Sequence, residues 1–172
     1  AHERNIVHRD MKPDNCFRIT WERDTDFIKV LDFGIAKLTG PDPERSSRLT
    51  VTNSVIGTDA YMAYEQVAGQ DCDHRIDIWS VGVMLYELLT GVLPFNGQNQ
   101  GQIWASIFQD NPPPMREVAP DANIPAAMDR IVACALQKSR DARYPTVEAL
   151  LRDLVRVEES SPVAERSRGP VK

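Results

Sequence analysis

The sequence contains few of the residues that mark disulfide-rich, metal-binding or membrane proteins. Its three cysteines, Cys16, Cys72 and Cys134, lie far apart, and none belongs to a CxxC pair. We therefore expect reduced thiols, not a disulfide framework or a zinc site. No apolar run approaches the roughly 20 residues that a membrane-spanning helix needs, so we expect no membrane segment in this chain. The longest run, at 81–89, is interrupted by glycine, tyrosine and glutamate and is typical of a buried helix.

An excess of positive charge is also absent. The 172 residues include 20 lysines and arginines against 25 aspartates and glutamates, which gives a net charge of −5. This balance argues against nucleic acid, or an anionic membrane surface, as the main partner. Hydrophobic residues make up 42% of the sequence and charged residues 26%, which is ordinary for one folded domain. The N-terminus lacks the apolar region of a signal peptide, and we expect a cytoplasmic location.

The first part of the chain predicts a hairpin followed by a loop. Segments 16–19 and 27–31 are rich in aromatic and β-branched residues, with the polar stretch 20–26 between them. This pattern predicts a β-hairpin with a rather long connection. Residues 35–58 have little periodicity and are rich in Ser, Thr, Arg, Asp and Pro. Such long stretches are usually functional or disordered, and we expect a long mobile loop.

Most of the chain after Arg75 shows helical periodicity. The segment from Arg75 to Gly91 is apolar nearly all the way round, which predicts a helix buried on most faces and closed by the glycine. Further helices are predicted at 100–109, 124–137 and 146–157. Thr146 can cap the last of these, and the polar tail 158–172 is predicted to be disordered. The fold class is therefore mainly α with a small β-hairpin.

The most informative strings are HRDMKPDN at 8–15 and DFG at 32–34. Moving a γ-phosphoryl group to a hydroxyl requires a carboxylate that orients the hydroxyl and accepts its proton. It also requires ligands that hold magnesium against the phosphates, and a cation that offsets charge on the transferred group. Magnesium prefers oxygen ligands and takes few of them from protein.

Four side chains in these strings meet those requirements. Asp10 can supply the first carboxylate and Lys12 the cation. Asn15 can supply an amide oxygen, and Asp32 a second carboxylate. The predicted hairpin between Asn15 and Asp32 would fold the two strings back onto one site.

These strings resemble the catalytic loop and the metal-binding motif of protein kinases. GTDAYMAYEQ at 57–66 resembles the end of a kinase activation loop, and DIWSVG at 77–82 resembles the start of the central buried helix of the large lobe. Arg143, in KSRDARYPT, matches the family arginine that pairs with the glutamate corresponding to Glu65. Residues 1–157 are thus identified as a partial protein kinase domain: the C-terminal lobe of the α+β kinase fold.

The resemblance implies catalytic roles for the matching residues. Asp10 would be the catalytic base, and Lys12 would contact the γ-phosphate. Asn15 and Asp32 would ligate magnesium, while Thr58 would form a hydrogen bond near Asp10 and Lys12. Lys12 and Thr58 together are the pattern of serine/threonine kinases, and the string LDFGIAKL is similar to bacterial members. The implied cofactors are ATP and Mg²⁺, and the implied substrate is a Ser or Thr hydroxyl of a protein.

A regulatory role is implied for Arg9, which would bind a phosphate on the activation loop. The candidate acceptors are Thr50, Thr52 and Ser54, with Ser46 and Ser47 behind them. The alternative is that these are ordinary polar loop residues.

Structural roles are implied for four more residues. His8 would be a strut under the magnesium motif, not a base. Asp77 would tie down the backbone of the catalytic loop, a role compatible with simple helix capping. Glu65 and Arg143 would form a buried structural pair.

The sequence departs from the family pattern in two ways. Asp59 and Tyr64 stand where the family has prolines that shape the segment receiving the substrate backbone, which leaves peptide specificity open. The sequence also has no GxGxxG loop, no VAIK-like lysine and no small-lobe helix with its partner glutamate. We therefore expect a missing small lobe, and an isolated chain that is inactive and exposes apolar surface.

Two functions remain open at this point. One is a serine/threonine kinase whose activity needs the missing N-terminal part. The other is a non-catalytic kinase-like module that binds partner proteins. Retention of Asp10, Asn15 and Asp32 favours the kinase, because a module without catalytic function is free to lose them.

Overall fold

The structure is a computed structural model that describes residues 1–4, 6–22, 24–32 and 58–160. Most of the predicted loop at 35–58 therefore lies outside the described residues, including Thr50, Thr52 and Ser54. The predicted disordered tail also lies outside them from residue 161 onward.

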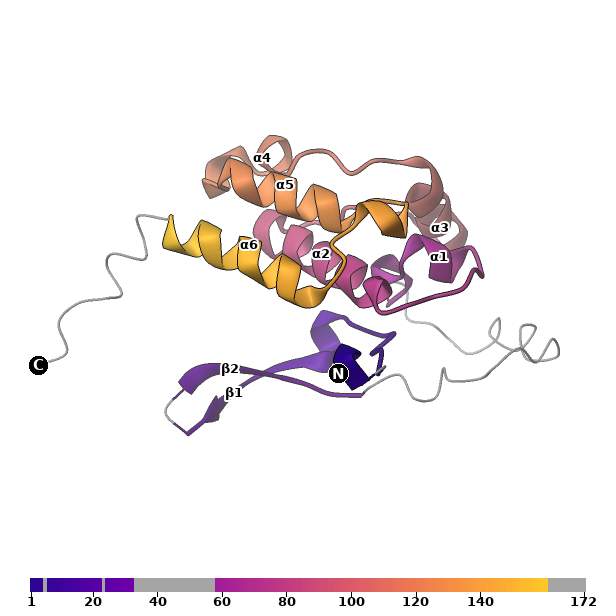
Figure 1. Ribbon diagram of the computed structural model, residues 1–172. Coiled ribbons are helices and arrows are strands. Elements are labelled where there is room, and N and C mark those ends of the chain that lie inside the picture. The colour runs from indigo at the N-terminus through magenta and orange to yellow at the C-terminus, as the bar shows by residue number, and fades with distance from the viewer. Residues whose placement is uncertain (5, 23, 33–57, 161–172) are drawn as a thin grey trace, which may run out of the picture.

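The described chain is a helical body with one β-hairpin on its side (Figure 1). The helices are α1 Tyr64–Val67, α2 Arg75–Thr90, α3 Gln100–Gln109, α4 Met115–Val118, α5 Ala126–Ala135 and α6 Val147–Glu159. Short 3-10 turns are η1 His2–Arg4, η2 Pro13–Asn15, η4 Thr58–Tyr61, η5 Pro120–Ala122 and η6 Arg140–Ala142. This arrangement confirms the mainly α fold class with a small hairpin.

Helix α2 forms the centre of the core, as its apolar sequence predicts. Ile76, Ile78, Trp79 and Val83 are each at most 1% exposed. The helix ends at Gly91, whose φ of 77° lies in the left-handed region and whose N–H donates to the Glu87 carbonyl. Only glycine adopts that conformation at little cost, so the predicted end of the helix is confirmed.

A stack of two rings and two cations packs beside α2. Trp79 and Phe95 lie with their ring centroids 5.3 Å apart and nearly parallel. The Arg143 guanidinium lies 4.9 Å from the centroid of Trp79, and the Lys138 ammonium 5.4 Å from that of Phe95. Burial lowers the pKa of Lys138, and its ammonium also donates to the Ile107 carbonyl. Cations over aromatic faces stabilise such clusters most when they are desolvated.

The remaining helices agree with the predictions apart from their ends. Helix α3 has the predicted bounds, and the α6 cap is confirmed, since Thr146 Oγ1 accepts from the Ala149 N–H at 3.2 Å. Helix α5 begins later than the predicted 124–137, because Pro125 is extended and disfavours helix in the residue before it, and it ends at Ala135. Helix α6 continues to Glu159, so the first residues of the predicted disordered tail are helical.

The hairpin consists of β1 Cys16–Trp21 and β2 Asp24–Val30, paired antiparallel with Cys16 opposite Val30. The prediction of a long connection is wrong, because both strands extend into the polar stretch. Trp21 and Phe27 lie with ring centroids 6.1 Å apart, and this contact favours the longer pairing. Phe17 and Ile28 are about half exposed, in agreement with the expected exposed apolar surface.

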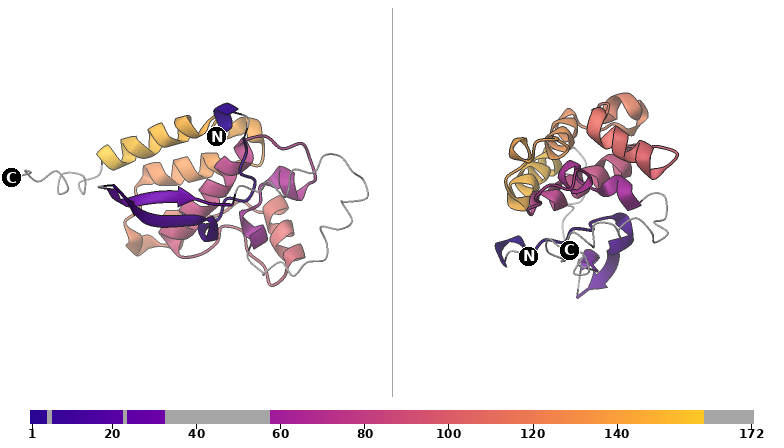
Figure 2. Two further views of the ribbon diagram at one scale, coloured as in Figure 1. Left: turned by 90° about the horizontal axis from the view of Figure 1, so that it is seen from below. Right: turned by 90° about the vertical axis from the view of Figure 1, so that its right-hand side faces the viewer.

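The hairpin and the N-terminal residues lie on one side of α2, while α4 and α5 lie on the other (Figures 1 and 2). Among the described residues, no helix combines the length and apolarity that crossing a bilayer requires. Cys16, Cys72 and Cys134 are free, and burial raises the pKa of each thiol.

Close contact between α2 and α5 depends on Gly82. A Cβ at this position would lie 2.8 Å from the Ala135 Cβ and 3.1 Å from a Leu136 methyl carbon. We predict that Gly82→Ala lowers the free energy of unfolding by about 1–3 kcal/mol, because the helices must separate. Urea denaturation of the complete protein measures this.

The matched control is Gly101→Ala on the exposed side of α3, where a Cβ lies no closer than 3.4 Å to Asn99 Oδ1. Helix propensity should make this change neutral or stabilising by up to about 1 kcal/mol. Equal stability of the two variants would contradict close packing at Gly82.

Candidate active site

Asp77, in the first turn of α2, fixes the backbone of the loop at 8–15. Its Oδ1 accepts from the Arg9 N–H and its Oδ2 from the His8 N–H, both at 2.8 Å. The His2 ring nitrogen lies 2.8 Å from the same Oδ2. Arg9 has a φ of 66°, a left-handed conformation that costs on the order of 1–3 kcal/mol in a non-glycine residue. The two anchored N–H groups hold the loop in this strained path.

His8 is buried and connects the loop to the end of β2. Its Nδ1 accepts from the Asp10 N–H at 3.3 Å, which leaves the proton on Nε2. Nε2–H then donates to the Leu31 carbonyl at 2.9 Å. Both ring nitrogens therefore anchor backbone groups, one in the loop at 8–15 and one at the end of the hairpin.

Asn15 and Lys12 meet at the Asp10 side chain. Asn15 Nδ2 donates to the Asp10 carbonyl at 2.7 Å and to Asp10 Oδ2 at 3.3 Å. Lys12 Nζ lies 3.6 Å from the same Oδ2. The carboxylate is thus oriented by an amide and lies beside a cation. Because the Asn15 nitrogen serves Asp10, its Oδ1 is the atom suited to a metal.

Asp32 is brought next to Asn15 by the hairpin. The Leu31 N–H donates to the Asn15 carbonyl at 2.9 Å, one residue beyond the Cys16–Val30 pair. Asp32 follows with an exposed side chain and a φ of 55°. The hairpin thus returns the chain at Leu31 and Asp32 to the end of the loop at 8–15, as the sequence predicted.

The donor set fits magnesium. An amide oxygen from Asn15 and a carboxylate from Asp32 are hard oxygen ligands, and two protein ligands are typical for this ion. The described residues contain no group of three or more His, Cys, Asp or Glu side chains suited to a metal. A magnesium site made of Asn15 and Asp32 contains one such side chain, Asp32, and so would not form a group of this kind.

The segment that begins at Thr58 is tied to the loop at 8–15 by Gln66, a residue that the sequence analysis did not single out. Thr58 begins η4, and Ala63 precedes α1. Gln66 Oε1 accepts from the Ala63 N–H at 2.9 Å, and its Nε2 donates to the Arg9 carbonyl at 3.2 Å. Nothing in local periodicity indicates such a long-range contact.

Glu65 and Arg143 form a buried, bidentate ion pair with distances of 2.8 and 2.6 Å. Arg143 Nε also donates to the Gln137 carbonyl at 2.7 Å. The remaining guanidinium bonds reach the carbonyls of Arg75 and Lys138, both at 3.2 Å. Desolvation of these charges is therefore offset by a complete set of hydrogen bonds.

The two positions that depart from the family prolines both contact α3. Asp59 is buried, and its Oδ2 accepts from Gln100 Nε2 at 2.6 Å, at the start of that helix. Tyr64 packs edge-to-face on Phe108, near the end of the helix, with centroids 5.2 Å apart. Asp59 and Tyr64, which stand at the family's proline positions, thus each contact a side chain of α3.

Residues 1–155 match the family described as "Protein kinase domain". The chain belongs to the protein kinase domain family. It is 40% identical over 158 residues to the serine/threonine-protein kinase pkn3 of Myxococcus xanthus, an alignment covering 92% of this chain and 29% of that relative. It is 36% identical over 162 residues to PknB of Mycobacterium tuberculosis, covering 94% of this chain and 24% of that kinase. The chain spans about a quarter of the length of these curated kinases.

Replacement of Asp77 by Asn tests the anchor of the catalytic loop. The amide nitrogen of the new side chain would face a backbone N–H and leave it without an acceptor. We expect amide hydrogen exchange at His8 or Arg9 to accelerate about tenfold, since an unsatisfied buried donor costs on the order of 1–3 kcal/mol. Exchange read by NMR on the complete protein measures this.

Asp121→Asn, a change of equal charge in the exposed turn η5, serves as the control and should leave both amides unaffected. Unchanged protection of His8 and Arg9 in the Asp77 variant would disprove the anchoring role.

Proposed function

We propose that this chain provides the catalytic loop of a protein kinase that transfers the γ-phosphoryl group of ATP to Ser and Thr hydroxyls of proteins. The observation that carries the proposal is the orientation of the Asp10 carboxylate by Asn15, beside Lys12. The names of the bacterial relatives, which are serine/threonine-protein kinases, support the choice of Ser and Thr.

Each side chain has a distinct task in the proposed reaction. Asp10 accepts a hydrogen bond from the substrate hydroxyl, orients it and takes its proton. Lys12 lies beside this carboxylate and offsets negative charge on the transferred phosphoryl group. Asn15 Oδ1 and the Asp32 carboxylate would hold Mg²⁺, which shields the phosphates when bound. Thr58 is the proposed hydrogen-bonding partner near Asp10 and Lys12.

The nucleotide-binding parts are proposed to come from outside these 172 residues. The sequence has no glycine-rich loop and no VAIK-like lysine, and it covers about a quarter of its relatives. We therefore propose that a small lobe acts together with this chain, and that the site works in the cytoplasm, where ATP is present.

Replacement of Asp10 by Asn tests the proposed base. We expect phosphorylation of a generic Ser/Thr protein substrate by the complete protein to fall by about 10²–10⁴-fold, because the amide cannot accept the proton. Nucleotide affinity should stay within a few-fold of the parent. Phosphate incorporation at saturating Mg²⁺ and ATP measures the rate, and fluorescent nucleotide titration measures binding.

Asp14→Asn is the matched control, since Asp14 is an exposed carboxylate in the same loop. It should retain activity within a few-fold. Parent-level activity of the Asp10 variant would instead support the non-catalytic binding module. Asp10-dependent activity of the 172-residue chain alone would contradict the need for a small lobe.

We further propose regulation by phosphorylation at Thr50, Thr52 or Ser54, with Arg9 as the residue that binds the phosphate. Incubation of the complete protein with ATP should place phosphate on at least one of these residues and raise activity. Peptide mass spectrometry locates it, and the Asp10→Asn protein is the control for self-phosphorylation. An active protein without phosphate anywhere between Ser46 and Thr58 would refute this regulation.

A further inference from the structure

Side chains of two helices hold the 3-10 turn η4, which follows the undescribed stretch 33–57. Ser80 Oγ, on α2, donates to the Tyr61 carbonyl at 2.8 Å. The Tyr61 hydroxyl donates to Glu87 Oε2, also on α2, at 2.6 Å. Gln100, on α3, donates to Asp59 Oδ2 at 2.6 Å. The turn therefore takes its position from both α2 and α3.

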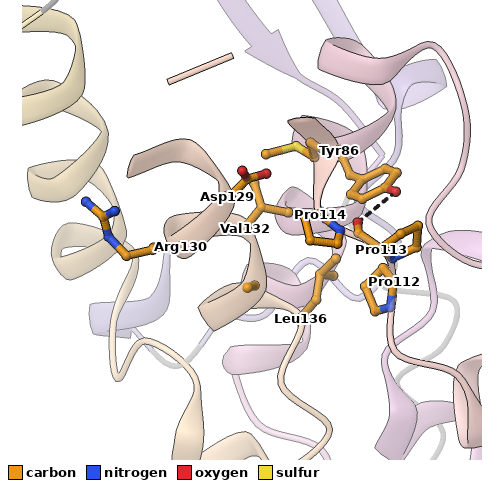
Figure 3. Close-up of a pocket in the computed structure, with 10 residues that line it drawn as sticks. Tyr86, Pro112, Pro113, Pro114, Asp129, Arg130, Val132 and Leu136 are labelled. Atoms are coloured by element: carbon orange, nitrogen blue, oxygen red, sulfur yellow. Dashed lines mark hydrogen bonds between the residues drawn. The ribbon is translucent and has the colours of Figure 1, made fainter. Parts of the chain in front are cut away.

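Another face of α2 packs against the chain on the side of α4 and α5. There the Tyr86 hydroxyl donates to the Pro113 carbonyl at 3.1 Å, beside an open apolar cavity of about 230 Å³ that Val132 and Leu136 also line (Figure 3). That face serves the packing of the helical body, whereas Ser80 and Glu87 connect α2 to η4.

The β-hairpin and helices α1 and α3 lie on opposite sides of the catalytic loop. Figures 1 and 2 both show the hairpin, which Asp32 follows, extending to one side of residues 8–15 and the two helices lying to the other. On the helical side Gln66 donates to the Arg9 carbonyl. In an in-line transfer the attacking hydroxyl and the leaving group lie on opposite sides of the phosphorus. A nucleotide held by magnesium at Asn15 and Asp32 therefore leaves the helical side for the protein substrate.

The turn η4 is close enough to the catalytic loop to be affected by its charge. Burial, then the hydrogen bond and the charge of Glu87, and after them the charge of Asp14, raise the pKa of the Tyr61 phenol. Asp14 belongs to the loop that carries Asp10. A protein substrate whose hydroxyl reaches Asp10 from the helical side thus runs along η4.

The bond between Asp59 and Gln100 is suited to fixing the start of this turn. Asp59 is 6% exposed, and a buried carboxylate needs donors that offset its loss of water. Gln100 is exposed in the first turn of α3, where the helix dipole also favours a nearby negative charge. Asn99 caps this helix by accepting from the Gln102 N–H at 3.0 Å, and Ile103 is buried. The backbone that carries the donor is therefore fixed.

The carboxylate stands at a position where the family has a proline. A proline fixes its own backbone angle through its ring. Asp59 has no such ring and is held by a partner on α3 instead. The position of η4 in this chain is therefore coupled to α3 through a side-chain contact.

We propose that Gln100 and Asp59 are positioning residues that determine how the protein substrate binds. Through their bond α3 holds η4 beside the catalytic loop, and the substrate segment that flanks the reacting hydroxyl lies against this turn. The inference rests on the proposed phosphoryl transfer, but it concerns binding of the protein substrate, not binding of the nucleotide or the chemical step.

Replacement of Gln100 by Ala removes the donor at an exposed position, so the complete protein should keep its fold. With dephosphorylated casein as the substrate, we expect the KM for casein to rise about three- to tenfold, because a hydrogen bond to a charged group is lost. The kcat and the KM for ATP should be unchanged. A rise in KM without a fall in kcat marks lost substrate binding, whereas a general loss of structure lowers kcat. Initial rates at varied casein and varied ATP measure both.

Further variants separate the bond from other effects at this position. Gln100→Lys retains a donor and should behave like the parent, while Gln100→Glu places a second carboxylate beside Asp59 and should raise the KM for casein more than Gln100→Ala does. In an Asp59→Ala protein, Gln100→Ala should cause no further change, because the partner is already gone. The matched control is Gln109→Ala, which truncates an exposed glutamine at the other end of α3 and should leave every constant unchanged.

An unchanged KM for casein in Gln100→Ala and Gln100→Glu would overturn the proposal, as would an equal rise in Gln109→Ala. A fall in kcat with the KM unchanged would also overturn it, because the bond would then serve stability alone. Each of these results would leave the proposed phosphoryl transfer standing, provided that Asp10→Asn still lowers activity. A parent protein that transfers no phosphate would contradict the proposed function, and this inference with it.

Discussion

The buried carboxylate of Asp77 holds the catalytic loop against the central helix. Taking a carboxylate out of water is costly unless donors surround it, and here two backbone N–H groups and the His2 ring lie within 2.8 Å. Its place in the first turn of α2 adds the favourable end of the helix dipole. This contact to its N–H stabilises the strained left-handed conformation of Arg9, which sets the direction of the chain into Asp10.

A second contact is made to the carbonyl of the same residue, Arg9. The Arg9 carbonyl accepts from Gln66, whose neighbour Glu65 is locked to Arg143. Arg143 in turn covers Trp79 on α2. The loop therefore contacts α2 through Asp77 and α1 through Gln66. The α1 contact is itself connected to α2, because Arg143 binds Glu65 and packs on Trp79. The two contacts hold the strained Arg9 at both its N–H and its carbonyl, and together they set the direction of the chain into Asp10.

Local sequence patterns were sufficient for the parts of the fold that depend on periodicity or on short motifs. The buried α2 and its end at Gly91, the bounds of α3, the cap at Thr146 and the family itself were all predictable. The length of the hairpin turn was not, because the Trp21–Phe27 contact that extends the strands is a cross-strand effect. The pairing of Asp59 with Gln100, and the role of Gln66, depend on residues distant in sequence that only the folded chain brings together.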